Sequence, residues 1–241
     1  MNKLAIFSCL SLMAVSAVAE THDIEIGSIG VTKITSSLKN TIVAVSFADL
    51  EAGGEIKVAD LVRTDNLTAG DQLAVFNGNT YDTWTLQGGA WVKNDMTFTQ
   101  GSDGLLEGTG TAADEATKVV GTGFWLIRNN DYTEGTEFTF YVFGKPVTSP
   151  TSSVPAKTVS LIGNPTQNDI ELIAEKITGV TVGDRIHLPQ AGGFKVYTYG
   201  EKGWYTFNES TKLYAYSNPT IPAGKGVWYL SVGENTVTIT W

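Results

Sequence analysis

The chain has 241 residues, of which 42% are apolar and 10% aromatic, so it is long enough to form one or two domains with hydrophobic cores. Only 17% of the residues are charged, and 25 acidic residues outnumber 16 basic ones. This balance is unsuited to coating phosphates, which excludes nucleic acid as the expected partner. The 26 glycines and the scarcity of long helix-forming runs favour strands joined by tight turns.

The first 19 residues have the three parts of a secretory signal peptide. A short basic segment, Met1–Lys3, precedes an apolar stretch over residues 4–15, and Ala17–Ala19 is a small-residue cleavage pattern before Glu20. The apolar stretch is short for a membrane span, and we expect no transmembrane helix elsewhere. The protein is therefore predicted to be exported, either outside the cell or to the envelope of a Gram-negative bacterium.

Cysteine usage agrees with this prediction. The single cysteine, Cys9, lies inside the segment that is expected to be removed. Disulfides, thiol nucleophiles and cysteine metal sites are then excluded from the processed chain. A chain exported without disulfides is typical of a bacterial envelope or secreted protein.

The remainder of the chain divides into two similar halves. Residues 146–157 contain three prolines and almost no charge, which predicts a linker between a first unit, residues 20–145, and a second unit, residues 158–241. The halves align in the same order through three matches: Thr68–Leu73 with Thr181–Ile186, Trp91 with Trp204, and Gly121–Leu126 with Gly224–Tyr229. We interpret this order as an internal duplication.

Within each half the pattern is mostly that of strands. In the first unit, residues 72–76, 81–86 and 90–93 form a predicted meander, with Gly88–Gly89 as a hairpin turn. Isoleucines at helical spacing over residues 170–177 indicate a short helical turn. We expect an all-β fold of two related β-sandwich or barrel-like units, with at most one or two short helical turns each.

Three segments of the second unit resemble a broad set of secreted bacterial β-rich modules with internal duplication. They are a short apolar strand with its Gly-Asn-Pro ending, Ser160–Pro165, an aromatic hairpin, Phe194–Trp204, and a closing run, Ile221–Trp228. The resemblance implies a surface-located or secreted β-rich protein. It carries over no catalytic residue.

The sequence contains few signals of catalytic chemistry. No nucleophile elbow, zinc-protease motif or phosphate-binding loop occurs, and the two histidines, His22 and His187, are far apart in the sequence. We assign no catalytic residue, metal or cofactor. The duplicated Gly70–Asp71 and Gly183–Asp184 pairs are interpreted as turns rather than as a metal or ligand position. Paired carboxylates of a glycoside hydrolase leave no short motif, so that alternative stays open.

Aromatic residues provide the candidate binding site. On the strand 194–199, Phe194 and Val196 share one face, and Tyr197 and Tyr199 share the other. If the Phe194 face is core, then Tyr197 and Tyr199 are exposed, with Trp84 as their counterpart in the first unit, and could stack on sugar rings. The favoured alternative is that both faces are covered. The duplicated tryptophans, which we expect in the cores, are Trp91, Trp204, Trp125 and Trp228.

We therefore predict a non-enzymatic surface or secreted protein that acts in adhesion, glycan contact or assembly. Its expected partner is an extracellular glycan or a surface protein. One alternative is a secreted glycan-active hydrolase using paired carboxylates. The other is an outer-membrane β-barrel, which the alternation of Val237, Ile239 and Trp241 at the end of the chain suggests.

Overall fold

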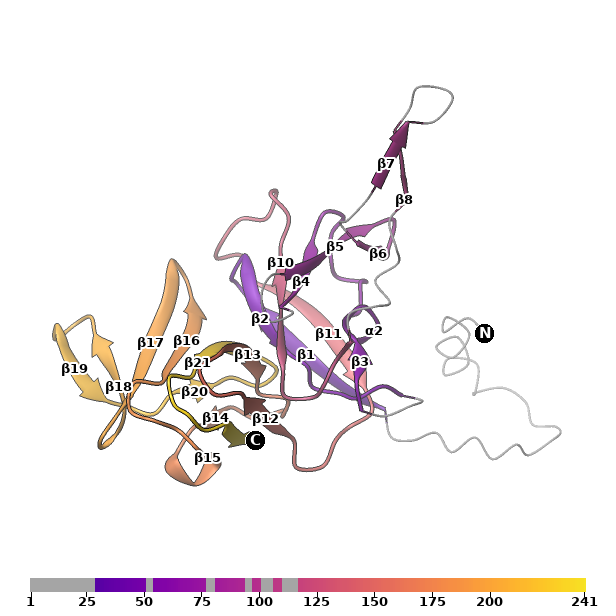
Figure 1. The fold of residues 1–241 in the computed structure, drawn as a ribbon. Helices are drawn as coiled ribbons and strands as arrows, with labels where there is room; N and C mark the ends of the chain where they lie inside the picture. The colour runs from indigo at the N-terminus through magenta and orange to yellow at the C-terminus, as the bar shows by residue number, and fades with distance from the viewer. Residues whose placement is uncertain (1–28, 51–53, 77–80, 94–96, 101–105, 110–116) are drawn as a thin grey trace, which may run out of the picture.

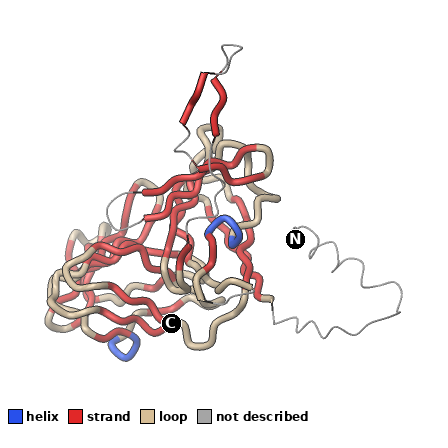
Figure 2. The backbone as a smooth tube through the Cα atoms, turned by 45° about the vertical axis from the view of Figure 1, so that its right-hand side comes forward, coloured by secondary structure: helices blue, strands red, loops and turns tan. Residues whose placement is uncertain are grey.

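The computed structural model describes residues 29–50, 54–76, 81–93, 97–100, 106–109 and 117–241. The predicted signal peptide and His22 lie outside these residues. Nearly all regular structure is strand (Figure 2), which confirms the all-β prediction. In the described part of the chain, no helix has the length and apolarity needed to cross a bilayer.

The first unit is built on a five-stranded antiparallel sheet. Its strands, in spatial order, are β2 (Asn40–Ala44), β10 (Gly123–Ile127), β4 (Gln72–Phe76), β5 (Tyr81–Gln87) and β6 (Ala90–Lys93). A second layer consists of β1 (Gly30–Ser36) paired with β11 (Phe138–Gly144). Ile34 of β1 and Phe140 of β11 share one buried cluster with Leu73 and Trp84 of the larger sheet, so the two layers enclose a sandwich core.

Short elements complete this unit. The two-residue strands β3 (Ile56–Lys57) and β9 (Thr117–Lys118) pair with each other, and one helical turn, α2 (Val58–Leu61), follows β3. A hairpin of β7 (Thr97–Gln100) and β8 (Leu106–Thr109) projects from the body of the unit (Figure 1).

The second unit repeats this plan with one additional strand in each layer. Its main sheet contains, in spatial order, β13 (Val159–Gly163), β21 (Gly226–Leu230), β16 (Arg185–Gln190), β17 (Gly193–Gly200), β18 (Gly203–Asn208) and β19 (Leu213–Tyr216). The opposing layer contains β12 (Thr151–Val154), β22 (Val237–Thr240) and β15 (Ile177–Thr178). The remaining elements are the pair β14 (Ile170–Glu171) and β20 (Thr220–Ile221) and the 3₁₀ turn η1 (Ala174–Lys176).

The strand registers of the two main sheets coincide. In the first unit Leu126 pairs with Leu73, and in the second Tyr229 pairs with Ile186. Likewise Trp91 pairs with Leu86, and Trp204 pairs with Tyr199. The residues matched by the sequence alignment therefore occupy equivalent places in two sheets of the same strand order.

The two units contact each other through equivalent segments. The N–H of Ala44 donates to the carbonyl of Gly224 at 2.9 Å, and the N–H of Gly163 donates to the carbonyl of Gly121 at 2.9 Å. Ala44 and Gly163 are equivalent residues, as are Gly121 and Gly224. Each unit thus gives and receives the same hydrogen bond, as subunits do across a two-fold axis.

Two predicted segments differ from the structure. Residues 146–157 are not a linker throughout, because Thr151–Val154 form β12 and pair with β22. Ser152 and Val154 alternate inward, and the indole N–H of Trp241 donates to the Ser152 hydroxyl at 2.6 Å. Of the segment 170–177, predicted to be a short helical turn, only η1 is helical, because Ile170 and Ile177 lie in short strands that pair with β20 and β22.

Candidate ligand-binding face

The aromatic residues predicted to bind a ligand do not form a surface. Trp84 is 2% exposed and Tyr197 is 4% exposed, and both belong to the cores of their units. Tyr199 is half-buried and packs edge-on against Trp204, with ring centroids 5.1 Å apart. The prediction that these side chains are free to stack on sugars is wrong, because their strand face meets the opposing sheet layer.

The four duplicated tryptophans divide into two pairs. Trp91 and Trp204 are buried in the cores, as predicted. Trp125 and Trp228 are instead half-buried between the units. The ring centroids of Trp125 and Phe194 are 6.4 Å apart, and those of Trp228 and Tyr81 are 6.3 Å apart. This equivalent pair of contacts explains why both positions keep a tryptophan without entering a core.

The Gly-Asp pairs are turns with buried carboxylates. Gly70 and Gly183 have φ values of 91° and 101°, a conformation in which other residues are strained. Asp71 accepts hydrogen bonds from the N–H groups of Thr68 and Asn129, both at 2.8 Å. Each carboxylate is fully buried and ties its turn to the end of a neighbouring strand.

Asp184 has the same arrangement with one different partner. It accepts from the N–H groups of Thr181 at 3.0 Å and Val232 at 2.8 Å, and from the Tyr229 hydroxyl at 3.0 Å. Burial and the adjacent carboxylate raise the pKa of Tyr229, so this hydroxyl stays a donor. With their acceptor sites occupied inside the fold, both aspartates are structural.

The opposite face of β16 to β19 is exposed and aromatic. Direct cross-strand pairing aligns Arg185, Thr198, Tyr205 and Tyr216 in one row across four strands. Beside this row, Phe207 pairs with Tyr214. We call the four rings of Tyr205, Phe207, Tyr214 and Tyr216 the aromatic face.

Exposure is greatest on the edge strand β19. Tyr214 is 71% exposed and Tyr216 is 60% exposed. The rings of Tyr205 and Tyr214 meet edge-on at 5.7 Å between centroids, and those of Phe207 and Tyr214 at 5.4 Å. The rings therefore support one another while remaining open to solvent, in an arrangement suited to contacting a flat apolar ligand surface.

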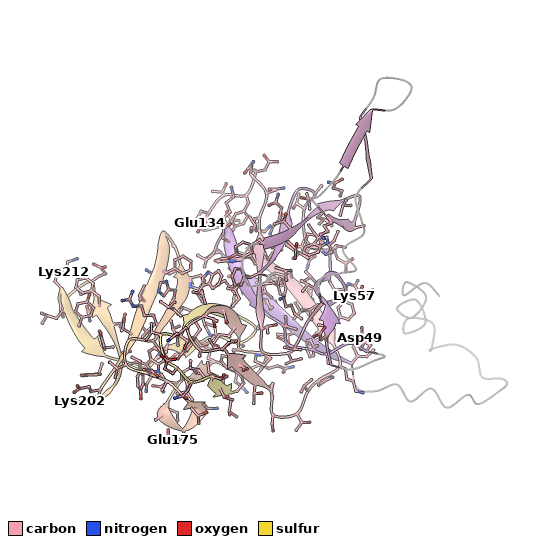
Figure 3. All side chains as sticks on the ribbon, viewed as in Figure 1. Asp49, Lys57, Glu134, Glu175, Lys202 and Lys212 are labelled. Carbon is pink, nitrogen blue, oxygen red and sulfur yellow. The ribbon has the colours of Figure 1, made fainter. Side chains whose placement is uncertain are left out.

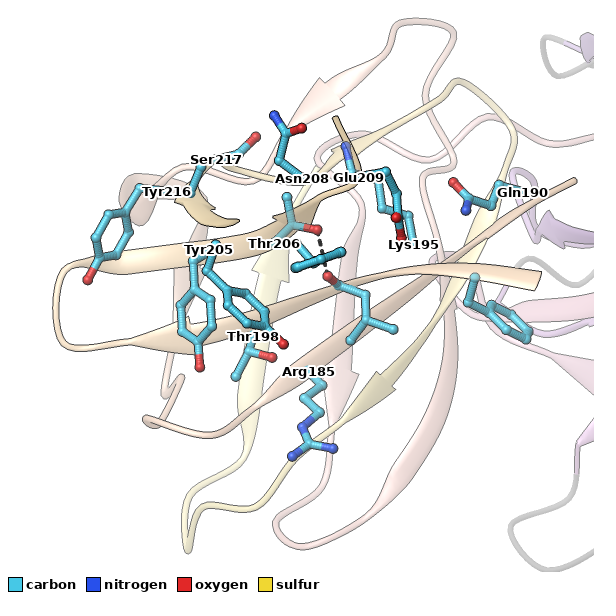
Figure 4. A pocket seen from close by; sticks show the side chains of 15 residues that line it. Arg185, Gln190, Lys195, Thr198, Tyr205, Thr206, Asn208, Glu209, Tyr216 and Ser217 are labelled. Atoms are coloured by element: carbon cyan, nitrogen blue, oxygen red, sulfur yellow. Dashed lines mark hydrogen bonds between the residues drawn. The ribbon is translucent and has the colours of Figure 1, made fainter. Parts of the chain in front are cut away.

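This face is hollowed into a groove of about 1250 Å³ (Figure 4). Polar and charged side chains line it together with the rings, among them Arg185, Gln190, Lys195, Asn208 and Glu209. Glu209 forms an ion pair with Lys212, at 2.9 Å. Lys212 lies at the outer end of the β18–β19 hairpin (Figure 3). The groove thus combines apolar rings with hydrogen-bonding groups around them.

The other charged groups of the groove are cationic and unpaired. Among the described residues, neither Arg185 nor Lys195 has a carboxylate within ion-pair distance. Lys195 Nζ lies 5.0 Å from the centroid of the buried Tyr197 ring, so this ammonium is on the inward side of β17, opposite to the aromatic face. His187, on the same strand as Arg185, has a lowered pKa because of its burial and the nearby guanidinium, and it is neutral at pH 7.

A smaller hollow of about 540 Å³ lies at the junction of the units. Its lining includes Phe76, Lys118 and Leu161. Lys118 Nζ donates to the Phe76 carbonyl at 2.8 Å, and burial lowers the pKa of this amine. That hydrogen bond links β9 to the end of β4, so we ascribe a structural role to Lys118.

Tyr205, Tyr214 and Tyr216 were not predicted as site residues. The signal was nevertheless available: Tyr205 and Phe207 alternate in one run, and Tyr214 and Tyr216 alternate in the next. When aromatic residues occupy every second position of two adjacent strands, their rings are predicted to lie on the same face of the hairpin.

Within the described ranges, histidine, cysteine, aspartate and glutamate side chains form no group of three or more that could hold a metal ion. Comparison of the chain with protein-family models, with curated proteins and with solved structures gave no match.

Proposed function

We propose that this chain is an exported, non-enzymatic binding protein of the bacterial surface or exterior, and that it contacts glycans through the aromatic face of its second unit. The observation that carries the proposal is the position of Tyr214 and Tyr216, two strongly exposed tyrosines on an edge strand that borders an open groove. Export is supported by the signal-peptide pattern of residues 1–19.

A glycan suits this face for chemical reasons. One side of a pyranose ring presents mainly C–H groups, which pack against an exposed aromatic ring, and its hydroxyl groups need hydrogen-bonding partners. The groove supplies such partners in Arg185 and Thr198, which lie in the same cross-strand row as Tyr205 and Tyr216. Apolar surfaces with a few well-placed polar groups are the usual composition of ligand sites.

Hydrolysis is less well supported than binding. Glycoside hydrolysis by paired carboxylates needs two acidic side chains on either side of the scissile bond. Of the described residues that line the groove, only Glu209 is acidic, and it is paired with Lys212. The groove therefore offers a surface for contact and not a pair of catalytic acids.

A double variant, Tyr214→Ala with Tyr216→Ala, tests the proposal on a glycan array. Because both side chains project into solvent, their removal should leave the thermal unfolding temperature nearly unchanged. The combined loss of the two stacking contacts should weaken the affinity for the glycan by about tenfold or more. Tyr141→Ala is the matched control, because Tyr141 is an exposed tyrosine on β11 of the first unit, outside the groove.

Three results would count against the proposal. They are absence of glycan binding by the parent protein, equal binding by the double variant, and release of reducing sugar by the purified protein. Export has a separate readout. Mass spectrometry of the protein from the expressing bacterium should give Glu20 as the first residue.

A further inference from the structure

We infer that the groove takes an acidic saccharide, one that carries carboxylate or sulfate groups, and that Arg185 is the residue that recognises the negative charge. This inference rests on the proposed glycan contact and specifies its ligand class. The structure supports it through the charge of the groove, the alignment of Arg185 with the tyrosines and the exposure of the guanidinium.

The charge of the groove is opposite to that of the protein. The whole chain has a formal net charge of −9. On the side of the aromatic face, the groove lining has one cation, Arg185, and its one carboxylate, that of Glu209, is paired with Lys212. Lys212 already neutralises Glu209, and Lys195 Nζ lies over the buried Tyr197 ring on the inward face of the sheet, so the positive charge of Arg185 remains for a ligand. A local excess of this kind on an acidic protein favours an anionic ligand at this one place.

The charged side chain and the aromatic rings lie in one row across the sheet. Arg185, Thr198, Tyr205 and Tyr216 pair directly across adjacent strands. With adjacent strands ~4.8 Å apart, the backbone positions of Arg185 and Tyr216 are separated by ~14 Å. An oligosaccharide lying across the strands would stack a ring on the tyrosines and bring an acidic group of another sugar unit to Arg185.

The guanidinium is suited to this role. It is exposed and, among the described residues, has no ion-pair partner. Its fork of N–H donors matches the two oxygens of a carboxylate, or of one edge of a sulfate, with two parallel hydrogen bonds. Figure 4 shows the Arg185 side chain extended away from the strand at the border of the groove, on the sheet that carries Tyr205 and Tyr216.

The test compares three oligosaccharides of equal length by isothermal titration calorimetry. One is a uronate, one is sulfated and one is a neutral glucan. The parent protein should bind at least one acidic oligosaccharide about tenfold more tightly than the neutral one, because a hydrogen-bonded charge pair adds to stacking. The uronate and the sulfated oligosaccharide distinguish the two sources of negative charge.

The variant Arg185→Gln should then lose about tenfold in affinity for the acidic oligosaccharide and change less than about twofold for the neutral one. Arg185→Lys keeps the charge but loses the fork and should fall between the two. Lys33→Gln is the control, because it removes an exposed positive charge from β1 of the first unit, away from the groove.

The outcomes separate the two proposals. Equal or tighter binding of the neutral oligosaccharide, or an equal loss on both ligands in Arg185→Gln, would overturn the acidic ligand and leave glycan contact standing. Failure of the parent to bind any of the three would overturn both. A concentration-dependent dimer in sedimentation velocity that disappears in the Tyr214→Ala/Tyr216→Ala variant would identify a second copy as the occupant of the face, and would also overturn both.

Discussion

The outward faces of the two main sheets share a backbone and differ in their side chains. Gln72, Thr85 and Val92 form a row across three strands of the first unit. At the equivalent positions the second unit has Arg185, Thr198 and Tyr205, and its additional strand β19 extends the row to Tyr216. The same strand registers thus carry a short polar and aliphatic row in one unit and a charged and aromatic row in the other.

The inward faces differ at one buried group. Asp71 and Asp184 make the same two backbone hydrogen bonds, but Arg128 Nε lies 3.0 Å from Asp71, whereas the Tyr229 hydroxyl donates to Asp184. Arg128 also lies over the rings of Phe138, at 4.3 Å, and Tyr132, at 5.2 Å. A buried carboxylate can therefore be stabilised in this fold either by a cation or by neutral donors alone.

Of the substitutions that test this comparison, removal of Arg128 should lower the free energy of unfolding the most. Arg128→Ala leaves the Asp71 carboxylate buried without its cation, and we expect the free energy of unfolding to fall by about 3–5 kcal/mol. Urea unfolding followed by tryptophan fluorescence measures the change. Tyr229→Phe removes one neutral donor in the second unit and should cost about 1–2 kcal/mol. A greater loss in Tyr229→Phe than in Arg128→Ala would contradict the distinction between the two sites.

The junction offers a second comparison, between Ala44 and Gly163. A Cβ atom on Gly163 would lie 2.5 Å from the Cα of Ala44 and 2.9 Å from the carbonyl oxygen of Thr122. Gly163→Ala should therefore lower the free energy of unfolding by about 1–3 kcal/mol through overpacking. Adding Ala44→Gly should recover part of that loss, because it removes the Cβ atom of Ala44, which would also lie 2.5 Å from the new methyl group. Thermal unfolding of both variants gives the measurement, and no recovery would show that the two residues do not share one packing space.

The smallest change in the free energy of unfolding is expected for a substitution in the junction turns, where Lys225 of the second unit is equivalent to Thr122 of the first. Burial lowers the pKa of Lys225 to about 8. Below pH 8 the amine is charged in both the folded and the unfolded state, so folding carries the full cost of burying the charge. Between pH 8 and the ordinary pKa of 10.5, the amine is neutral in the folded state and still charged in the unfolded state. The free energy of unfolding therefore rises with pH in this range. Lys225→Thr should add roughly 1 kcal/mol at pH 7.

The measurement for Lys225 is the difference between variant and parent in urea unfolding at pH 7 and at pH 10. That difference should shrink at the higher pH, because the parent then loses its penalty. A difference that is independent of pH would mean that the amine reaches water in the folded protein. Lys33→Thr is the control, since Lys33 is exposed on strand β1, where a β-branched residue is readily accommodated.

Much of the fold was predictable because its signals are local. The runs expected at residues 72–76 and 90–93 are β4 and β6, and Gly88 and Gly89 have the positive φ values of a hairpin turn. The choice of inward face was not predictable in the same way. Strand alternation separates Phe194 from Tyr197, but both faces carry aromatic rings, and only the opposing layer of β12, β22 and β15 decides which of them is covered.

The same limit explains the segment 146–157. Its prolines and serines indicate an extended chain, which is correct, but its pairing partner β22 lies more than 80 residues later in the sequence. Long-range pairing of a short polar strand leaves no local trace. The candidate face depends on such pairing as well, since Arg185 and Tyr216 join one row only when four strands are assembled in register.

The reciprocal hydrogen bonds between Ala44 and Gly224 and between Gly163 and Gly121 have a consequence for how the two units diverge. They are the contacts of a symmetric dimer whose subunits share one chain, so their association is intramolecular and does not weaken on dilution. Two identical free subunits must change together at every position. A tethered pair is released from that constraint, and one member can acquire charged and aromatic groups while the other keeps the plainer surface.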